Sequence, residues 1–225
     1  MRPFAHRLAV ALDSAGRGEF PKADGAVEVL SPPPGPAMGI VAFTAHHMIA
    51  TSAPESWIRA QLPPGDLRAP MSPRFLTALG DKLGGHDDGI DLLLAARGLQ
   101  GRSTLRETTS ESHPRLTRAN IHRDQVRVFT DPTGAATIIL GRGLANRTEV
   151  SIEIDPTRRN QGIARQALTE ARRIVDADQL LFAQAAPGNA ASIRTLLTAG
   201  FQPIGSEVLF YRPSSPRSSP AASGT

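Results

Sequence analysis

Hydrophobic and polar positions follow the period of a β-strand most clearly after residue 120. The segment QVRVFTD (125–131) alternates between the two classes, and AATIILGRG (135–143) and NRTEVSIEID (146–155) are further strand-like runs. Pro-Thr-Gly at 132–134 separates the first two as a turn. The three segments therefore predict an antiparallel meander.

The pattern then changes to helices and strands in alternation. The segment 159–177 places Ile163, Ala167, Ala171 and Ile174 on one helical face. The apolar run QLLFAQAA (179–186) is typical of a central strand. The order that follows is a helix over 189–199 and a closing strand over 204–212, which makes βββαβαβ and predicts an α/β domain with a mixed sheet.

The helix expected after residue 189 has recognisable ends. Asn189 is placed to cap its N-terminus, and Gly200 is placed to end it. Ile193, Leu196 and Leu197 are expected to face the core.

The N-terminal half is less regular. AVEVL (26–30) and GIVAFTAHHMIA (39–50) are strand-like runs on either side of the Pro-rich turn at 31–39, and helices are expected at 55–61 and 73–82. GIDLLLAARGL (89–99) is a buried strand or a short helix, and 101–114 is a linker or a solvated helix. We therefore divide the chain into a partly disordered lead-in (1–22), an N-terminal α/β region (23–100), a core (101–212) and a disordered tail (213–225).

The amino-acid composition excludes some classes of function and disfavours others. The 225 residues are 40% hydrophobic and 20% charged, as in a soluble globular protein, and the absence of Cys excludes disulfides and a thiolate nucleophile. The net charge of +4 comes with acidic residues interspersed throughout, which does not favour a nucleic-acid partner. We see neither a signal peptide nor an apolar run long enough to span a bilayer, so we expect a cytoplasmic protein without a membrane partner.

The segment RRNQGIARQAL (158–168) raises the question of what lies at the start of its helix. The first-turn amides of a helix lack internal acceptors, and the helix dipole adds positive charge there. Gly162 lets an anion approach the backbone, and Asn160 tolerates a positive φ. Arg158 and Arg159 add permanent positive charge. The pattern is typical of a phosphate site, although a plain strand-to-helix connection with surface arginines has the same residues.

The order of these motifs resembles the GNAT superfamily of acyl-CoA-dependent N-acyltransferases over residues 115 to 212. The resemblance is carried by IEIDPTRRNQGIA (152–164), similar to the family's strand and pyrophosphate loop, and by NAASIRTLLTAGF (189–201), similar to its second motif. It implies a GNAT-like fold with an N-terminal α/β extension. The segment 39–62 echoes the strand-to-helix pattern of 148–168, which is consistent with a degenerate half-repeat.

The resemblance also implies roles for individual residues. The acetyl-CoA pyrophosphate would be held by the loop residues Arg159, Gln161, Gly162, Ile163 and Ala164. Ile152 and Ile154 would lie along the pantetheine arm, with the Ile154 amide polarising the acyl carbonyl. Asn189 and Ser192 are expected beside the pantetheine, although Asn189 as a pure helix cap is the alternative.

The residues that would act as general acid and general base are harder to assign from the sequence. Many relatives place a Tyr seven residues after the position of Asn189, and this chain has Leu196 there; its one Tyr is Tyr211. For the general base we choose Glu149 first and Glu153 second. The alternative is that both are solvent-facing partners of Arg147 or Arg159. A branch of the family that acts on protein N-termini has a Glu where this chain has Gln184.

These observations lead to an expected function. The chain is expected to transfer an acetyl group from acetyl-CoA to the amine of a small molecule or peptide, as a monomer or homodimer and without a metal. The alternative is a non-catalytic acyl-CoA-binding regulatory module, which the missing Tyr favours.

Overall fold

A computed structural model describes residues 5–85, 89–108, 119–120 and 122–211, and the expected disordered tail lies outside them. Ten strands form one sheet in the order β1-β3-β2-β10-β4-β9-β8-β7-β6-β5. Their bounds are β1 Val27–Leu30, β2 Ala37–Phe43, β3 His46–Ala50, β4 Asp91–Arg97, β5 Arg106–Thr108, β6 Asp124–Thr130, β7 Ala136–Arg142, β8 Thr148–Ile154, β9 Leu180–Ala185 and β10 Gln202–Tyr211. The β1–β3 and β8–β9 pairs are parallel and the others antiparallel, so the expected mixed α/β class is confirmed.

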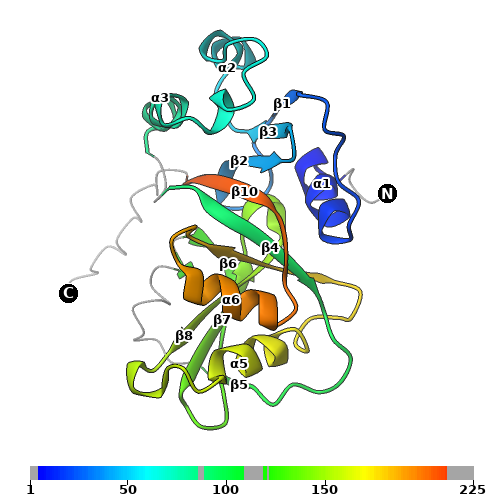
Figure 1. Ribbon diagram of the computed structural model, residues 1–225, viewed down its shortest axis with the longest axis vertical. Helices are drawn as coiled ribbons and strands as arrows, with labels where there is room; N and C mark the ends of the chain where they lie inside the picture. Colours follow the sequence, from blue (N-terminus) through cyan, green and yellow to red (C-terminus); the bar gives the residue numbers. More distant parts are fainter. Residues whose placement is uncertain (1–4, 86–88, 109–118, 121, 212–225) are drawn as a thin grey trace, which may run out of the picture.

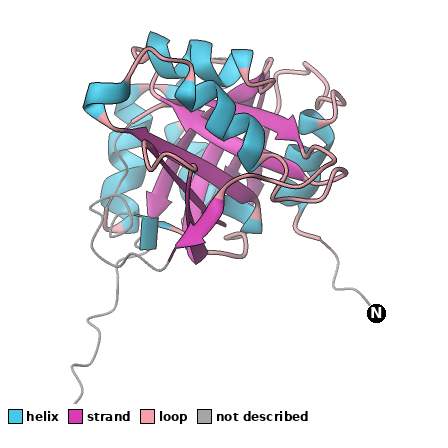
Figure 2. Ribbon diagram, turned by 90° about the horizontal axis from the view of Figure 1, so that it is seen from below, coloured by secondary structure: helices cyan, strands magenta, loops and turns pink. Residues whose placement is uncertain are grey.

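Helices cover both faces of this sheet (Figures 1 and 2). Their bounds are α1 Arg7–Gly16, α2 Glu55–Gln61, α3 Pro73–Leu83, α5 Ile163–Ala171 and α6 Ala190–Thr198, with short 3-10 turns η1 Ala69–Met71, η2 Leu144–Asn146 and η3 Pro156–Arg158. Helices α5 and α6 share one apolar cluster with the inward side chains of β7, β8 and β9. Helix α1 packs on the opposite face, against side chains such as Leu93 and Phe182.

The N-terminal region extends the sheet. Strand β4, from before the expected boundary near residue 100, lies between β9 and β10, and β10 in turn pairs with β2. The lead-in contributes to the core, because Leu8, Leu12 and Ala15 of α1 are all buried. Apolar residues at helical spacing give α1 this buried face.

Most expected elements are observed, one open alternative is decided, and three expectations differ. The run 39–50 is two strands, β2 and β3, joined by a tight turn at Thr44–Ala45, where Ala45 has φ 49°. The ambiguous run 89–99 is the strand β4, and part of 101–114 is the strand β5. Leu197 was expected in the core and is 41% exposed, because only Leu196 of this pair faces the sheet.

The N-terminal half also contains a hairpin followed by a helix (β2, β3, α2), the order found again in β7, β8 and α5. The half-repeat stays a prediction.

Candidate functional site

Strands β8 and β9 are parallel neighbours that pair at one register position, between Glu149 and Phe182. Past this pair β8 continues to Ile154 and β9 to Ala185, and neither continuation pairs with the other strand. The other edge of β8 is paired with β7 along its whole length. The sheet is therefore forked between β8 and β9, and we call this opening the fork.

Backbone groups of β8 point into the fork. The carbonyl of Arg147 accepts from the Gly143 amide, and the amide of Asp155 donates to the Ala135 carbonyl. The backbone amide and carbonyl groups of the odd-numbered residues therefore point toward β7. Because successive residues of a strand direct these backbone groups to opposite edges, the amides of Ile152 and Ile154 point away from β7. The fork therefore presents backbone donors at the two positions where the sequence predicted contacts with a pantetheine arm.

The loop after β8 is shaped by local hydrogen bonds. The Asp155 carboxylate accepts from the amide of Thr157 at 2.8 Å, which starts the turn η3. Asn160 and Gly162 both have positive φ, 62° and 77°. Gly162 is the N-cap of α5, and a Cβ added to it would meet no atom within 4 Å. The sequence prediction of a curled loop with open space at Gly162 matches this geometry.

The amides of this loop are available to a ligand. In the described part of the chain, no acceptor bonds the amides of residues 159–165. The Arg158 side chain donates to Gln161 Oε1 at 3.2 Å, while Arg159 is exposed and forms no ion pair with a described residue. Unsatisfied first-turn amides with nearby guanidinium groups fit a phosphate. The chain thus has a phosphate-compatible helix start beside the fork.

Asn189 and Ser192 form the cap of α6. The Asn189 side chain accepts from the Ser192 amide at 3.1 Å, which confirms the capping prediction. A ligand-binding role for either residue stays a prediction. Leu196, at the place of the missing Tyr, is buried in the same helix.

Glu149 belongs to a buried chain of alternating charges. Its carboxylate accepts from Arg147 Nε at 2.8 Å and from Arg123 Nε at 2.9 Å. The other end of Arg147 is bound bidentately by Glu207 of β10, at 2.7 and 2.5 Å. Glu149 is 2% exposed and Glu207 is 1% exposed. These four residues, called here the ion chain, join β8 to a strand that is three positions away in the sheet.

The ion chain sets the acidity of Glu149. Burial by itself would raise the pKa of this carboxyl, but the positive charges of Arg147 and Arg123, with hydrogen bonds to the carboxylate, lower the pKa to about 2. The carboxylates of Glu207 and Glu149 likewise overcome the effect of burial and raise the pKa of Arg147. A carboxylate with this low pKa, and with both oxygens bonded to arginines, is a poor proton acceptor. The structure therefore argues against the general-base role expected for Glu149.

The lowered pKa of Glu149 makes stability depend on pH. Its pKa is about 2 in the folded chain against 4.5 as the reference value, so the unfolded state binds more protons between these values. The stabilisation is present above about pH 4.5 and is lost as the pH falls toward 2; it amounts to about 3 kcal/mol. We expect Glu149→Gln to reduce the loss of unfolding free energy as the pH falls from about 5 to 2, measured by urea unfolding. An equal loss of unfolding free energy in the two proteins would show that the folded chain does not lower the pKa of Glu149.

Arg123 connects the two sides of the fork. Besides Glu149, its guanidinium donates to Ser151 Oγ of β8 at 3.1 Å and to Gln184 Oε1 of β9 at 3.4 Å. It therefore ties β8 to β9 at the place where their pairing ends. The sequence named Arg147 as an alternative partner of Glu149, and the hydrogen bond of 2.8 Å between them confirms it, although Glu149 is buried and not solvent-facing. Arg123 and Glu207 were missed, because Arg123 lies 61 residues from Gln184 and Glu207 lies 60 residues from Arg147.

The remaining candidates are placed as follows. Glu153 is partly buried on β8, where it faces Thr137 of β7 in register. The Tyr211 ring contacts that of His122, at 4.0 Å between centroids. Within the described ranges, no cluster of three His, Asp or Glu residues could hold a metal ion, and no helix is long and apolar enough to cross a membrane.

Comparison with known proteins gives a weak likeness to acetyltransferases. No family model matches the chain, and no curated protein matches it. A GNAT-family acetyltransferase from Colwellia psychrerythraea aligns with 57% of this chain at 12% identity and a TM-score of 0.38. A GCN5-related N-acetyltransferase from Kribbella flavida aligns with 65% of it at 17% identity and the same TM-score. The aligned parts span 59% and 65% of those two chains, so the functional assignment depends on the geometry of the site.

Proposed function

We propose that the chain is an acyl-CoA-dependent N-acyltransferase that uses acetyl-CoA. The observation that carries the proposal is the combination of the fork with the start of α5. The amides of Ile152 and Ile154 point into the fork, where β9 does not pair with them, and the amides of 159–165, which no described residue bonds, lie at the end of the same strand. A ligand with a thioester at one end and a diphosphate further along matches both sets of donors.

Different parts of the site would bind the diphosphate and orient the acyl group. The loop amides and the guanidinium of Arg159 would hold the diphosphate, and Gly162 keeps its approach open. The amides of Ile152 and Ile154 would orient the pantetheine arm and the acyl carbonyl. Acetyl-CoA supplies an acetyl group activated as a thioester.

The reaction that fits this arrangement is direct transfer. The lone pair of a neutral amine forms the C–N bond at the acyl carbon, and the C–S bond breaks. The amine proton passes to water or to Glu153, and the thiolate takes a proton from solvent. Because the pKa of Glu149 is about 2, we assign proton removal to water or to Glu153.

A second candidate is a module that binds acyl-CoA without turnover. Two observations favour it. Leu196 occupies the position where many relatives have a Tyr, and both carboxylate oxygens of Glu149 are bonded within the ion chain. Neither observation removes the binding donors, so both candidates predict acetyl-CoA affinity. They differ in the release of free CoA thiol.

A thiol-release assay with amines separates the two candidates. The full chain is incubated with acetyl-CoA and a panel of amino acids, polyamines, aminoglycosides and short peptides. Binding is measured in parallel by isothermal titration. Release of free thiol with at least one amine supports the transferase. Binding without release across the panel selects the module, and the absence of binding contradicts both.

A further inference from the structure

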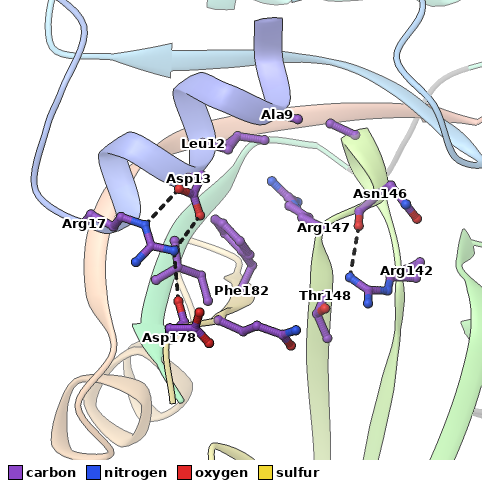
Figure 3. Close-up of a pocket in the computed structure, with 13 residues that line it drawn as sticks. Ala9, Leu12, Asp13, Arg17, Arg142, Asn146, Arg147, Thr148, Asp178 and Phe182 are labelled. Carbon is purple, nitrogen blue, oxygen red and sulfur yellow. Dashed lines mark hydrogen bonds and ion pairs between the residues drawn. The ribbon is translucent and has the colours of Figure 1, made fainter. Parts of the chain in front are cut away.

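A pocket of about 310 Å³ lies on the face of the sheet opposite α5 and α6, beneath the N-terminal helix α1. It is bounded by α1, by the segment around η2 and by the residues that lead into β9 (Figure 3). Its volume is at the lower end of the range for small-molecule sites, which is roughly 300–1,000 Å³. Its apolar lining includes Leu12, Leu180 and Phe182.

One wall of this pocket is fixed by polar contacts. Arg17, which caps the C-terminus of α1, binds the Asp13 carboxylate at 2.8 and 3.1 Å and donates to the carbonyl of Asp178 at 2.9 Å. These bonds hold α1 against the start of β9. They use the carbonyl of Asp178 and leave its carboxylate without an ion pair among the described residues.

The opposite wall carries an available positive charge. Arg142, at the end of β7, lines the pocket and makes one hydrogen bond, from Nη1 to the carbonyl of Asn146 at 3.3 Å. Its guanidinium forms no ion pair within the part of the chain that is described. Figure 3 shows Arg142 and Asp178 on different sides of the Phe182 ring. The pocket thus presents a cation, an anion and an apolar surface to one small ligand.

The pocket also reaches the closed end of the fork. Phe182 lines it, and Phe182 is the residue that pairs with Glu149 where β8 and β9 meet. Thr148, the first residue of β8, lines it as well.

We propose that this pocket binds a small amino-acid-like zwitterion with an apolar side chain, at a site separate from the open part of the fork. Arg142 would hold its carboxylate, Asp178 its ammonium group, and Leu12, Leu180 and Phe182 its side chain. Binding to this pocket does not rest on the proposed transferase function.

The test measures ligand binding to the full chain without acetyl-CoA. Leucine, leucinamide and 4-methylpentanoate are titrated by nuclear magnetic resonance; the second lacks the carboxylate and the third lacks the amine. The wild type should prefer leucine over each analogue by about tenfold. Arg142→Gln should abolish the preference over leucinamide, and Asp178→Asn should abolish the preference over 4-methylpentanoate.

Arg59→Gln on α2 is the control, because Arg59 forms an exposed pair with Glu55 and does not line the pocket. It should leave all three affinities unchanged. Equal affinity of the wild type for leucine and leucinamide, or preferences that survive both substitutions, would overturn the proposal. Leucine binding together with no thiol release from any amine of the panel would refute the transferase and leave the pocket assignment standing. Thiol release with other amines and no leucine binding would do the reverse.

Discussion

Replacement of Gly162 by glutamate is expected to abolish measurable binding of acetyl-CoA. Gly162 has φ 77° and open space at its Cβ position, at the start of α5. A glutamate there would put bulk and a negative charge where the diphosphate is expected, beside the unbonded amides. Loss of that contact and the added repulsion should weaken binding by at least about 100-fold in isothermal titration.

Gly65→Glu provides a matched control for this experiment. Gly65 also has φ 77° and an open Cβ position, in a loop between α2 and η1. The backbone strain and the added charge are therefore equal in the two variants. Gly65→Glu should keep the wild-type affinity, and an equal loss of affinity in both variants would show that the effect is not specific to the loop.

Replacement of Arg147 by leucine is expected to give the largest loss of stability. It removes the middle cation of the ion chain and leaves Glu207 buried without this bidentate partner. Breaking a buried ion pair in this way costs about 3–5 kcal/mol of unfolding free energy. Urea unfolding at neutral pH measures the loss.

Two further variants show whether charge is the cause. Adding Glu207→Gln to Arg147→Leu should recover part of the lost stability, because it neutralises the carboxylate that is left alone. Arg59→Leu removes an arginine from an exposed pair and should change the unfolding free energy by at most about 1 kcal/mol. If Arg147→Leu unfolds at the same urea concentration as the wild type, the ion chain does not stabilise the fold.

Local sequence signals predicted the elements that local chemistry determines. The cap at Asn189 is a local helix signal, and α2, α3 and α6 lie where the pattern places them. The loop 155–164 was also predictable, because its conformation depends on nearby residues such as Asp155, Asn160 and Gly162. The turn at Ala45 was missed since Thr-Ala carries no turn signal.

Long-range contacts were beyond the reach of the sequence pattern. Glu149 looked like an accessible base because strand parity alone does not show what covers a side chain. Its burial comes from Arg123 and Arg147, and the partner of Arg147 is in β10. The position of β4 between β9 and β10, and the pocket under α1, likewise depend on tertiary contacts.

The central claim is that the amides of 159–165 and those of Ile152 and Ile154 bind one acyl-CoA molecule. Titration of the nitrogen-15-labelled chain with acetyl-CoA, followed by nuclear magnetic resonance, tests it residue by residue. The account predicts that the largest amide shifts occur in these two segments and saturate together, and that Gly162→Glu removes both sets. Saturating shifts confined to other parts of the chain, or saturation of the two segments at different concentrations, would contradict it.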